Sequence, residues 1–85
     1  MTEFEYTLKD KDGIHARPAG LFVKKAASFN SNITISKGEK QADAKRLFAI
    51  MGLAAKCGDT IVVTANGDDE ETAARELKTF LSENL

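Results

Sequence analysis

Apolar residues recur at helical spacing in two long segments of the chain and alternate with polar residues in two shorter ones. The spacing i, i+3, i+4, i+7, i+8 predicts a helix from about Pro18 to Ser28 or Phe29. The positions that share its apolar face are Ala19, Phe22, Val23, Ala26 and Ala27. A second stripe predicts a helix that closes the chain, with its buried face at Ala73, Ala74, Leu77, Phe80 and Leu81.

The period-2 alternation of half-buried strands occurs at residues 4–8 and 33–36. Residues 60–65, Thr-Ile-Val-Val-Thr-Ala, form the most strand-like segment, which predicts a central strand. Residues 40–43 have weak strand propensity, so we expect an edge strand there.

Between these strands, the apolar run around Leu47 and Ile50 predicts a short helix over residues 46–53, ended by Gly52 or by a turn at Gly58. Asp68 followed by Glu71 is a variant capping box and predicts the start of the last helix. The element order is therefore βαββαβα, in a single domain over residues 1–85. Strands with one polar face predict an antiparallel sheet with helices on its other face, an open two-layer α+β sandwich.

The segment 13–19, Gly-Ile-His-Ala-Arg-Pro-Ala, contains the only histidine and the only proline of the chain. Pro18 suits the first positions of a helix and disfavours the αR conformation at Arg17. We therefore expect the helix to start near Pro18, with His15 at or just before its N-terminus. A helix N-terminus offers unpaired amides to an anion, Arg17 adds a charged fork, and a neutral imidazole is a nucleophile. These features together make His15 a candidate to accept a phosphoryl group.

The alternative interpretation of these residues is structural, with His15 in a surface loop, Gly13 at a turn and Pro18 starting a helix. For an isolated histidine this alternative is the commoner case. No second histidine and no pair of carboxylates converges on the segment in the sequence. This inventory favours a carrier, whose partners supply the catalysis, over a complete enzyme.

Composition excludes several other classes. A net charge of -1 argues against a general nucleic-acid binder, and no apolar run approaches the ~20 residues of a membrane span. One cysteine, Cys57, cannot form an internal disulfide, which fits a reducing, cytoplasmic location. Cys57 and His15 are the only soft ligands, so we expect neither a metal site nor a cofactor. We expect Cys57 to be a small filler residue in a turn at residues 56–59.

The segment 13–19 resembles the active-site signature of the histidine-containing phosphocarrier protein (HPr) family of the bacterial phosphoenolpyruvate:sugar phosphotransferase system. The resemblance extends over the chain length, the order of elements and a second stretch, Ala-Lys-Arg-Leu-Phe at residues 44–48. It implies a four-stranded antiparallel sheet of order 1-4-2-3 covered by three helices.

The resemblance also implies residue roles. His15 would accept a phosphoryl group on Nδ1 from phospho-enzyme I and pass it to enzyme IIA domains for sugar uptake. Arg17 would balance the phosphate charge, and the amides of Ala16 and Arg17 would cap it. Partners would dock on an apolar patch formed by Ala16, Gly20, Leu21, Lys24, Leu47, Phe48 and Met51. The alternative is that Leu47, Phe48 and Met51 belong to the core. We expect a monomer, with the basic residues Lys24, Lys25, Lys45 and Arg46 forming a ring that meets acidic partner surfaces.

Two residues depart from the family pattern. Many relatives carry a regulatory serine where this chain has Arg46, which cannot take a phosphate from a serine kinase, so we expect no regulation there. Asp12 stands where relatives often have Asn or Ser. A carboxylate at that position would work against a phosphorylated ring if it points inward, and the sequence leaves its direction open.

Other functions stay open on sequence grounds. A nitrogen-type paralogue would feed a regulatory phosphorelay instead of sugar uptake, and the sequence does not distinguish it from a sugar-system carrier. A small α+β binding module of RRM or ACT type is a different class. The strand at residues 60–65 lacks the aromatic residues that an RRM uses to stack bases, and an ACT module has no use for the segment 13–19. An acylphosphatase-like enzyme would turn over its substrate alone.

Overall fold

The computed structural model describes residues 1–85 and contains four strands and three helices in the order βαββαβα, as predicted. In chain order the elements are β1 (Thr2–Thr7), α1 (Ala16–Ala27), β2 (Asn32–Lys37), β3 (Lys40–Asp43), α2 (Leu47–Met51), β4 (Thr60–Asn66) and α3 (Glu70–Asn84).

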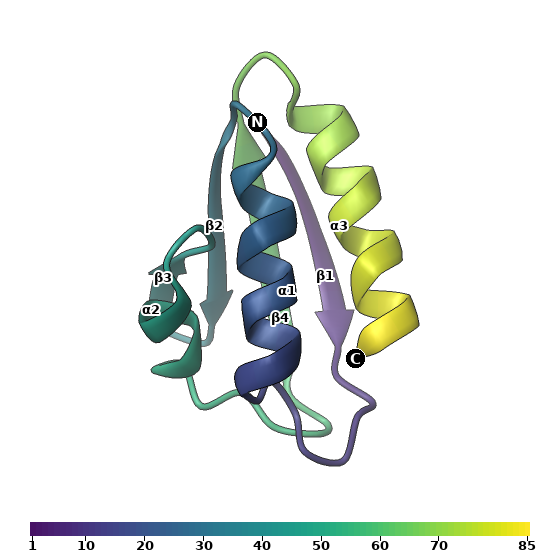
Figure 1. Cartoon of the computed structure of the whole chain (residues 1–85). Helices are drawn as coiled ribbons and strands as arrows, with labels where there is room; N and C mark the ends of the chain where they lie inside the picture. Colours follow the sequence, from purple (N-terminus) through teal and green to yellow (C-terminus); the bar gives the residue numbers. More distant parts are fainter.

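The strands form one antiparallel sheet of order β1-β4-β2-β3 (Figure 1). The predicted central strand, β4, lies between β1 and β2, and the weak strand β3 lies at an edge. In the register, Val63 of β4 pairs with Phe4 of β1 and with Ile35 of β2. The fold class and the strand order expected from the HPr resemblance are confirmed.

One face of the sheet is covered by helices, and the other is open. Helices α1 and α3 lie side by side over the covered face, and α2 lies beside the lower half of α1 (Figure 1). Beneath them lies one continuous apolar cluster, which includes Ile35, Val63 and Leu77. The open face presents the polar positions of the same strands, such as Glu3 and Thr64, as the alternation predicts. The helices and the sheet therefore form two layers with the apolar core between them.

Helix α1 differs from its prediction at both ends. It begins at Ala16, so Arg17 is helical despite the following proline, and the expected start near Pro18 was wrong. Pro18 fits at the third helical position because the first amides of a helix have no partner, and the first intrahelical bond runs from the Ala19 amide to the His15 carbonyl, 3.0 Å. At the other end the helix stops at Ala27, just before the predicted end at Ser28 or Phe29, and Ala27 is exposed. The buried residues of the helix are Pro18, Ala19, Phe22 and Ala26.

Two further predictions needed correction. Helix α2 spans only Leu47–Met51 and ends at Gly52, so the predicted span 46–53 was too long. The predicted capping box of α3 was also wrong: the N-cap residue is Asp69, and its side chain does not cap the helix. Its carboxylate instead accepts hydrogen bonds from the amides of Asn30 and Ser31, at 2.8 and 2.9 Å, and from the Ser31 hydroxyl. Asp69 therefore joins the start of α3 to the segment between α1 and β2.

The Asp69 contacts predict an acid-sensitive contribution to stability. The Ser31 hydroxyl, followed by the Asn30 amide, holds the pKa of Asp69 below the 3.8 of an unperturbed aspartate. A carboxyl whose pKa is lowered on folding stabilises the protein above its unfolded pKa, and this contribution is lost as the pH falls through the folded pKa. We expect Asp69→Asn to lower the Tm by about 5 °C at neutral pH. The difference from wild type should shrink on acidification below 3.8.

Thermal unfolding followed by circular dichroism across this pH range measures the effect. Asp68→Asn is the matched control, because Asp68 is the exposed neighbour on the same turn. Equal Tm changes in the two variants would contradict the assigned role of Asp69.

Candidate functional site

His15 is exposed and is the N-cap residue of α1, at the lower end of the helix in Figure 1. Its backbone is extended (φ -100°, ψ 179°), and its side chain makes no capping hydrogen bond. The imidazole is therefore free to react, and the predicted position at the helix N-terminus is confirmed.

The loop before His15 is held by backbone contacts that only glycine permits. Gly13 has φ +64°, and a Cβ atom there would lie 2.3 Å from the carbonyl oxygen of Ala55. That same carbonyl accepts a hydrogen bond from the Ile14 amide at 3.0 Å, and the Ile14 side chain is buried. The chain next to His15 is thus attached to the segment that follows α2.

The groups expected to hold a phosphate do converge beside His15. The amides of Ala16 and Arg17 donate no hydrogen bond within the protein, and no acidic side chain occupies the first turn of α1. His15, Arg17, Pro18, Leu21 and Asn84 line one surface hollow of about 210 Å³. A guanidinium beside the free amides of a helix N-terminus is the chemistry of an anion site.

The proposed docking residues form an exposed surface. Phe48 is 83% exposed and Leu21 46%, and Met51 is also exposed. The core alternative is therefore excluded for Phe48 and Met51, while Leu47 is half-buried and packs against the core. Ala16 and Lys24 are exposed and Gly20 is half-buried on the same helix as Leu21. Several large apolar side chains exposed on two neighbouring helices are typical of an interaction surface, whereas a single one would not be.

The predicted basic ring is smaller than expected. Lys45 donates to the Phe29 carbonyl at 2.9 Å, and Lys25 pairs with Glu76 at 2.9 Å. Arg46 is the N-cap residue of α2, is exposed, and lies 3.9 Å from the Asp43 carboxylate. Lys24 makes no ion pair, which leaves Lys24 and Arg46 as the cations of this group most available to a partner.

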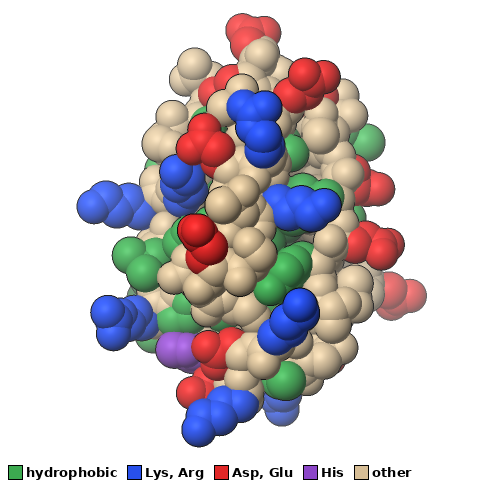
Figure 2. Space-filling view, turned by 90° about the vertical axis from the view of Figure 1, so that its right-hand side faces the viewer, with side chains coloured by type: hydrophobic (Ala, Val, Ile, Leu, Met, Phe, Trp, Pro, Cys, Tyr) green, Lys and Arg blue, Asp and Glu red, His purple; other side chains and the backbone are tan.

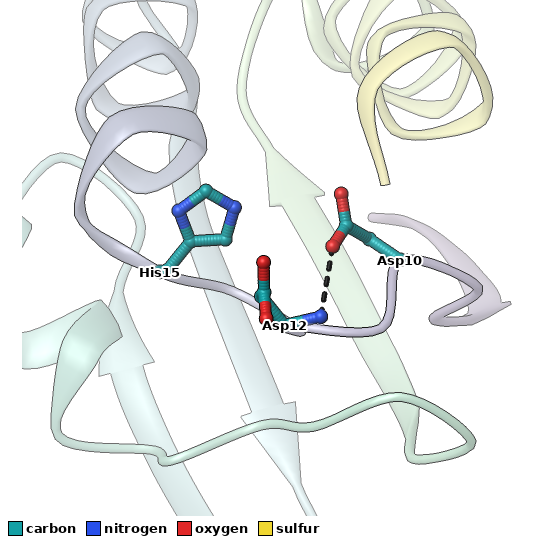
Figure 3. A group of neighbouring side chains, drawn as sticks. All are labelled: Asp10, Asp12 and His15. Carbon is teal, nitrogen blue, oxygen red and sulfur yellow. Dashed lines mark hydrogen bonds between the residues drawn. The ribbon is translucent and has the colours of Figure 1, made fainter.

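The exposed side chain of Asp12 points towards the imidazole of His15, a direction that the sequence left open. One oxygen of Asp12, one of Asp10 and one ring nitrogen of His15 all lie within 4.8 Å of one another. Figure 3 shows both carboxylates on the side of the imidazole that faces away from α1. The spacing would allow the three groups to share a cation, but all are on an accessible loop, and the expectation of no metal site stays a prediction.

Sequence reasoning missed two residues at this site. Asn84 reaches the hollow from the end of α3, and Asp10 comes from the loop after β1. The fold of the far end of the chain places Asn84, and the conformation of the loop after β1 places Asp10. Cys57 lies on a turn, as expected, but it does not fill a packed site, because it is exposed, with Sγ 3.7 Å from the Lys9 carbonyl oxygen.

Comparison with known proteins identifies the family. A family model described as the PTS HPr component phosphorylation site matches residues 2–83. The chain belongs to the HPr family.

Individual relatives agree with this assignment. The phosphocarrier protein HPr of Mycoplasma capricolum is 41% identical over 78 residues, which are 92% of this chain and 88% of the relative. The HPr-like protein Crh of Halalkalibacterium halodurans is also 41% identical, covering 95% of this chain and 96% of the relative. The crystal structure of HPr from Thermoanaerobacter tengcongensis has a TM-score of 0.93 at 40% identity, covering 98% of this chain and 93% of that structure. None of the helices here is long and apolar enough to cross a membrane.

The close approach of Gly13 to Ala55 predicts a loss of stability when a side chain is added at residue 13 of this HPr-family protein. Gly13→Ala should destabilise the fold by about 3 kcal/mol, because it combines an unfavourable positive φ with a backbone clash. Gly38→Ala is the matched control: Gly38 has φ +60°, but nothing lies within 4 Å of a Cβ placed there. The control should cost only about 1 kcal/mol. Urea denaturation measures both, and equal losses would show that the contact with Ala55 does not constrain the loop.

Proposed function

We propose that this protein is a phosphocarrier of the phosphoenolpyruvate-dependent sugar phosphotransferase system. In this function His15 accepts a phosphoryl group from phospho-enzyme I and passes it to enzyme IIA domains. The observation that carries the proposal is the exposed, uncapped His15 imidazole next to the free amides of Ala16 and Arg17. Membership of the HPr family supports the same chemistry.

The transfer needs only groups that this site supplies together with its partner. The lone pair of Nδ1 attacks the phosphorus atom, the bond between phosphorus and the donor breaks, and the donor keeps that electron pair. The Arg17 guanidinium and the two amides balance the charge of the phosphoryl oxygens. In the next transfer a nucleophile of the acceptor attacks the phosphorus atom, and His15 is the leaving group. The proposal requires no bound cofactor or metal ion.

Partner docking is proposed to use the exposed surface beside His15. Its members are Ala16, Gly20, Leu21, Lys24, Leu47, Phe48 and Met51. Helix α1 packs against α2, so this surface and His15 lie on one side of the molecule. We further propose a single domain over residues 1–85 that acts as a cytoplasmic monomer, because self-association through Phe48 would hide the surface that transient partners need.

Arg46 favours a carrier without serine-kinase control. It occupies the N-cap position of α2 with its side chain exposed, and its fixed positive charge is opposite to that of a phosphoserine. The HPr of M. capricolum and the Crh protein of H. halodurans are equally similar to this chain, so overall similarity does not choose between a sugar carrier and a regulatory relative. The residues at the site favour the carrier. A nitrogen-type phosphorelay uses the same chemistry and would differ only in its partners.

The proposed function predicts one phosphate on the wild type and none on His15→Ala. Both proteins are incubated with phosphoenolpyruvate and a general enzyme I, and intact mass is recorded at alkaline pH. The added mass should disappear on brief acid treatment, because a phosphohistidine is acid-labile. A known HPr run in parallel shows that the enzyme I is active. Phosphate on His15→Ala, or none on the wild type while the known HPr is phosphorylated, would overturn the proposal.

The docking surface predicts a loss of affinity on truncation. Phe48→Ala should weaken binding to enzyme I by about tenfold, because an exposed aromatic residue in the centre of an interface contributes more than 1 kcal/mol. Val62→Ala, on the open face of the sheet, is the control and should bind like the wild type. Calorimetric titration of both variants measures the affinities. Unchanged binding of Phe48→Ala, with an unchanged circular dichroism spectrum, would contradict this docking surface.

A further inference from the structure

Two carboxylates lie beside the reactive imidazole without a cation to balance them. Asp10, Asp12 and His15 each place one polar side-chain atom within 4.8 Å of the others (Figure 3). No lysine or arginine nitrogen lies within 4.0 Å of either carboxylate. The single histidine also has acidic side chains directly beside it in Figure 2, at the lower edge of that face. Neither carboxylate is therefore neutralised by a close ion pair.

Hydrogen bonds hold the turn that carries both acids and fix the Asp10 side chain. The Asp12 amide donates to Oδ1 of Asp10 at 2.9 Å, and the Gly13 amide donates to the Asp10 carbonyl, also at 2.9 Å. The Asp10 amide in turn donates to the carbonyl of Leu85 at 2.8 Å. The Asp12 side chain is exposed and accepts no hydrogen bond from the protein, so its position follows from the backbone of this turn.

We propose that Asp12, together with Asp10, weakens the hold of His15 on its phosphoryl group and so makes that group easier to transfer. This inference rests on the proposed function and adds a property of this particular chain. A phosphoryl group carries up to two negative charges near neutral pH. The two carboxylates lie on the far side of the ring from a group on Nδ1 and repel it across the imidazole, through partly solvated space where like charges still interact. The amides and Arg17 on the α1 side favour acceptance, while the acids on the other side favour release.

The transfer that the acids promote is balanced. The acceptor nucleophile forms a bond to phosphorus, the bond between phosphorus and the His15 nitrogen breaks, and the imidazole keeps that electron pair. The two carboxylates take no proton and form no bond. Their effect is on the energy of the phosphorylated state relative to the free histidine.

A competition between wild type and Asp12→Asn measures this energy directly. Equal amounts of ¹⁵N-labelled wild type and unlabelled variant share a limiting amount of phosphoenolpyruvate and a trace of enzyme I, which exchanges phosphate between them until equilibrium. Intact mass then resolves all four species. We expect about threefold more phosphate on Asp12→Asn at low salt. The exchange is run at about pH 8.5, because a proton on the second ring nitrogen would attract the same carboxylates and mask the repulsion.

Three controls make the result specific. Asp68→Asn removes the same charge at the opposite end of α1 and α3 and should share phosphate equally with the wild type. Asp10→Asn keeps an oxygen that can accept the Asp12 amide and should shift the partition in the same direction as Asp12→Asn. Because exposed charges are screened at about 1 M salt, the preference for Asp12→Asn should fall towards unity there.

Each outcome decides a separate point. Phosphate shared equally, or in favour of the wild type, overturns this inference alone, since both proteins are then shown to be carriers. A preference that persists undiminished at high salt overturns it too, because the substitution then acts through conformation. If neither protein gains phosphate while a known HPr does, the proposed function itself fails.

Discussion

The contact between Gly13 and Ala55 is the constraint on which the site depends. Here the backbone of the loop after β1 approaches the segment after α2 so closely that a single methyl group would not fit. The Ala55 carbonyl accepts the Ile14 amide, and the carbonyl of the next residue, His15, accepts the first hydrogen bond of α1. One short stretch of backbone therefore sets the direction of the helix, the exposure of the imidazole and the position of α2 relative to both.

Groups of opposite charge lie on the two sides of the His15 ring. The N-terminus of α1 and Arg17 favour an anion, whereas Asp10 and Asp12 oppose one. A carrier must accept a group from one partner and lose it to another, so strong binding of the phosphoryl group would slow the second step. Opposing charges on the two sides of the ring let the protein both accept the group and release it, and the loop after β1 supplies the acids.

Local patterns predicted the elements well because each depends on residues close in sequence. The edge strand Lys40–Asp43 and the central strand β4 follow from propensity and alternation alone. Arg17 was misplaced because the conformational preference before proline is modest and the helix could absorb Pro18 where no amide partner is needed. The role of Asp69 was missed because its partners, Asn30 and Ser31, lie in another part of the chain.

The residues of the site also divide into those predicted from nearby sequence and those placed by contacts between distant segments. His15 and Arg17 were identified from their neighbours in the sequence, and the structure places them in one hollow. The direction of the Asp12 side chain towards His15, and the position of Asn84 beside it, depend on how the loop after β1 meets the end of α3. No periodicity in the sequence predicts that contact.

The shape of the site is consistent with the proposed carrier function. The hollow beside His15 is only about 210 Å³ and is lined by one nucleophile and one cation, with the carboxylates of Asp10 and Asp12 beside the ring. Phe48, on α2, exposes 83% of its surface to water. A binding pocket for a small substrate would bury its apolar groups around the reacting atom. Here Phe48 is exposed instead, and under the proposed function a partner protein would cover it and exclude water from His15.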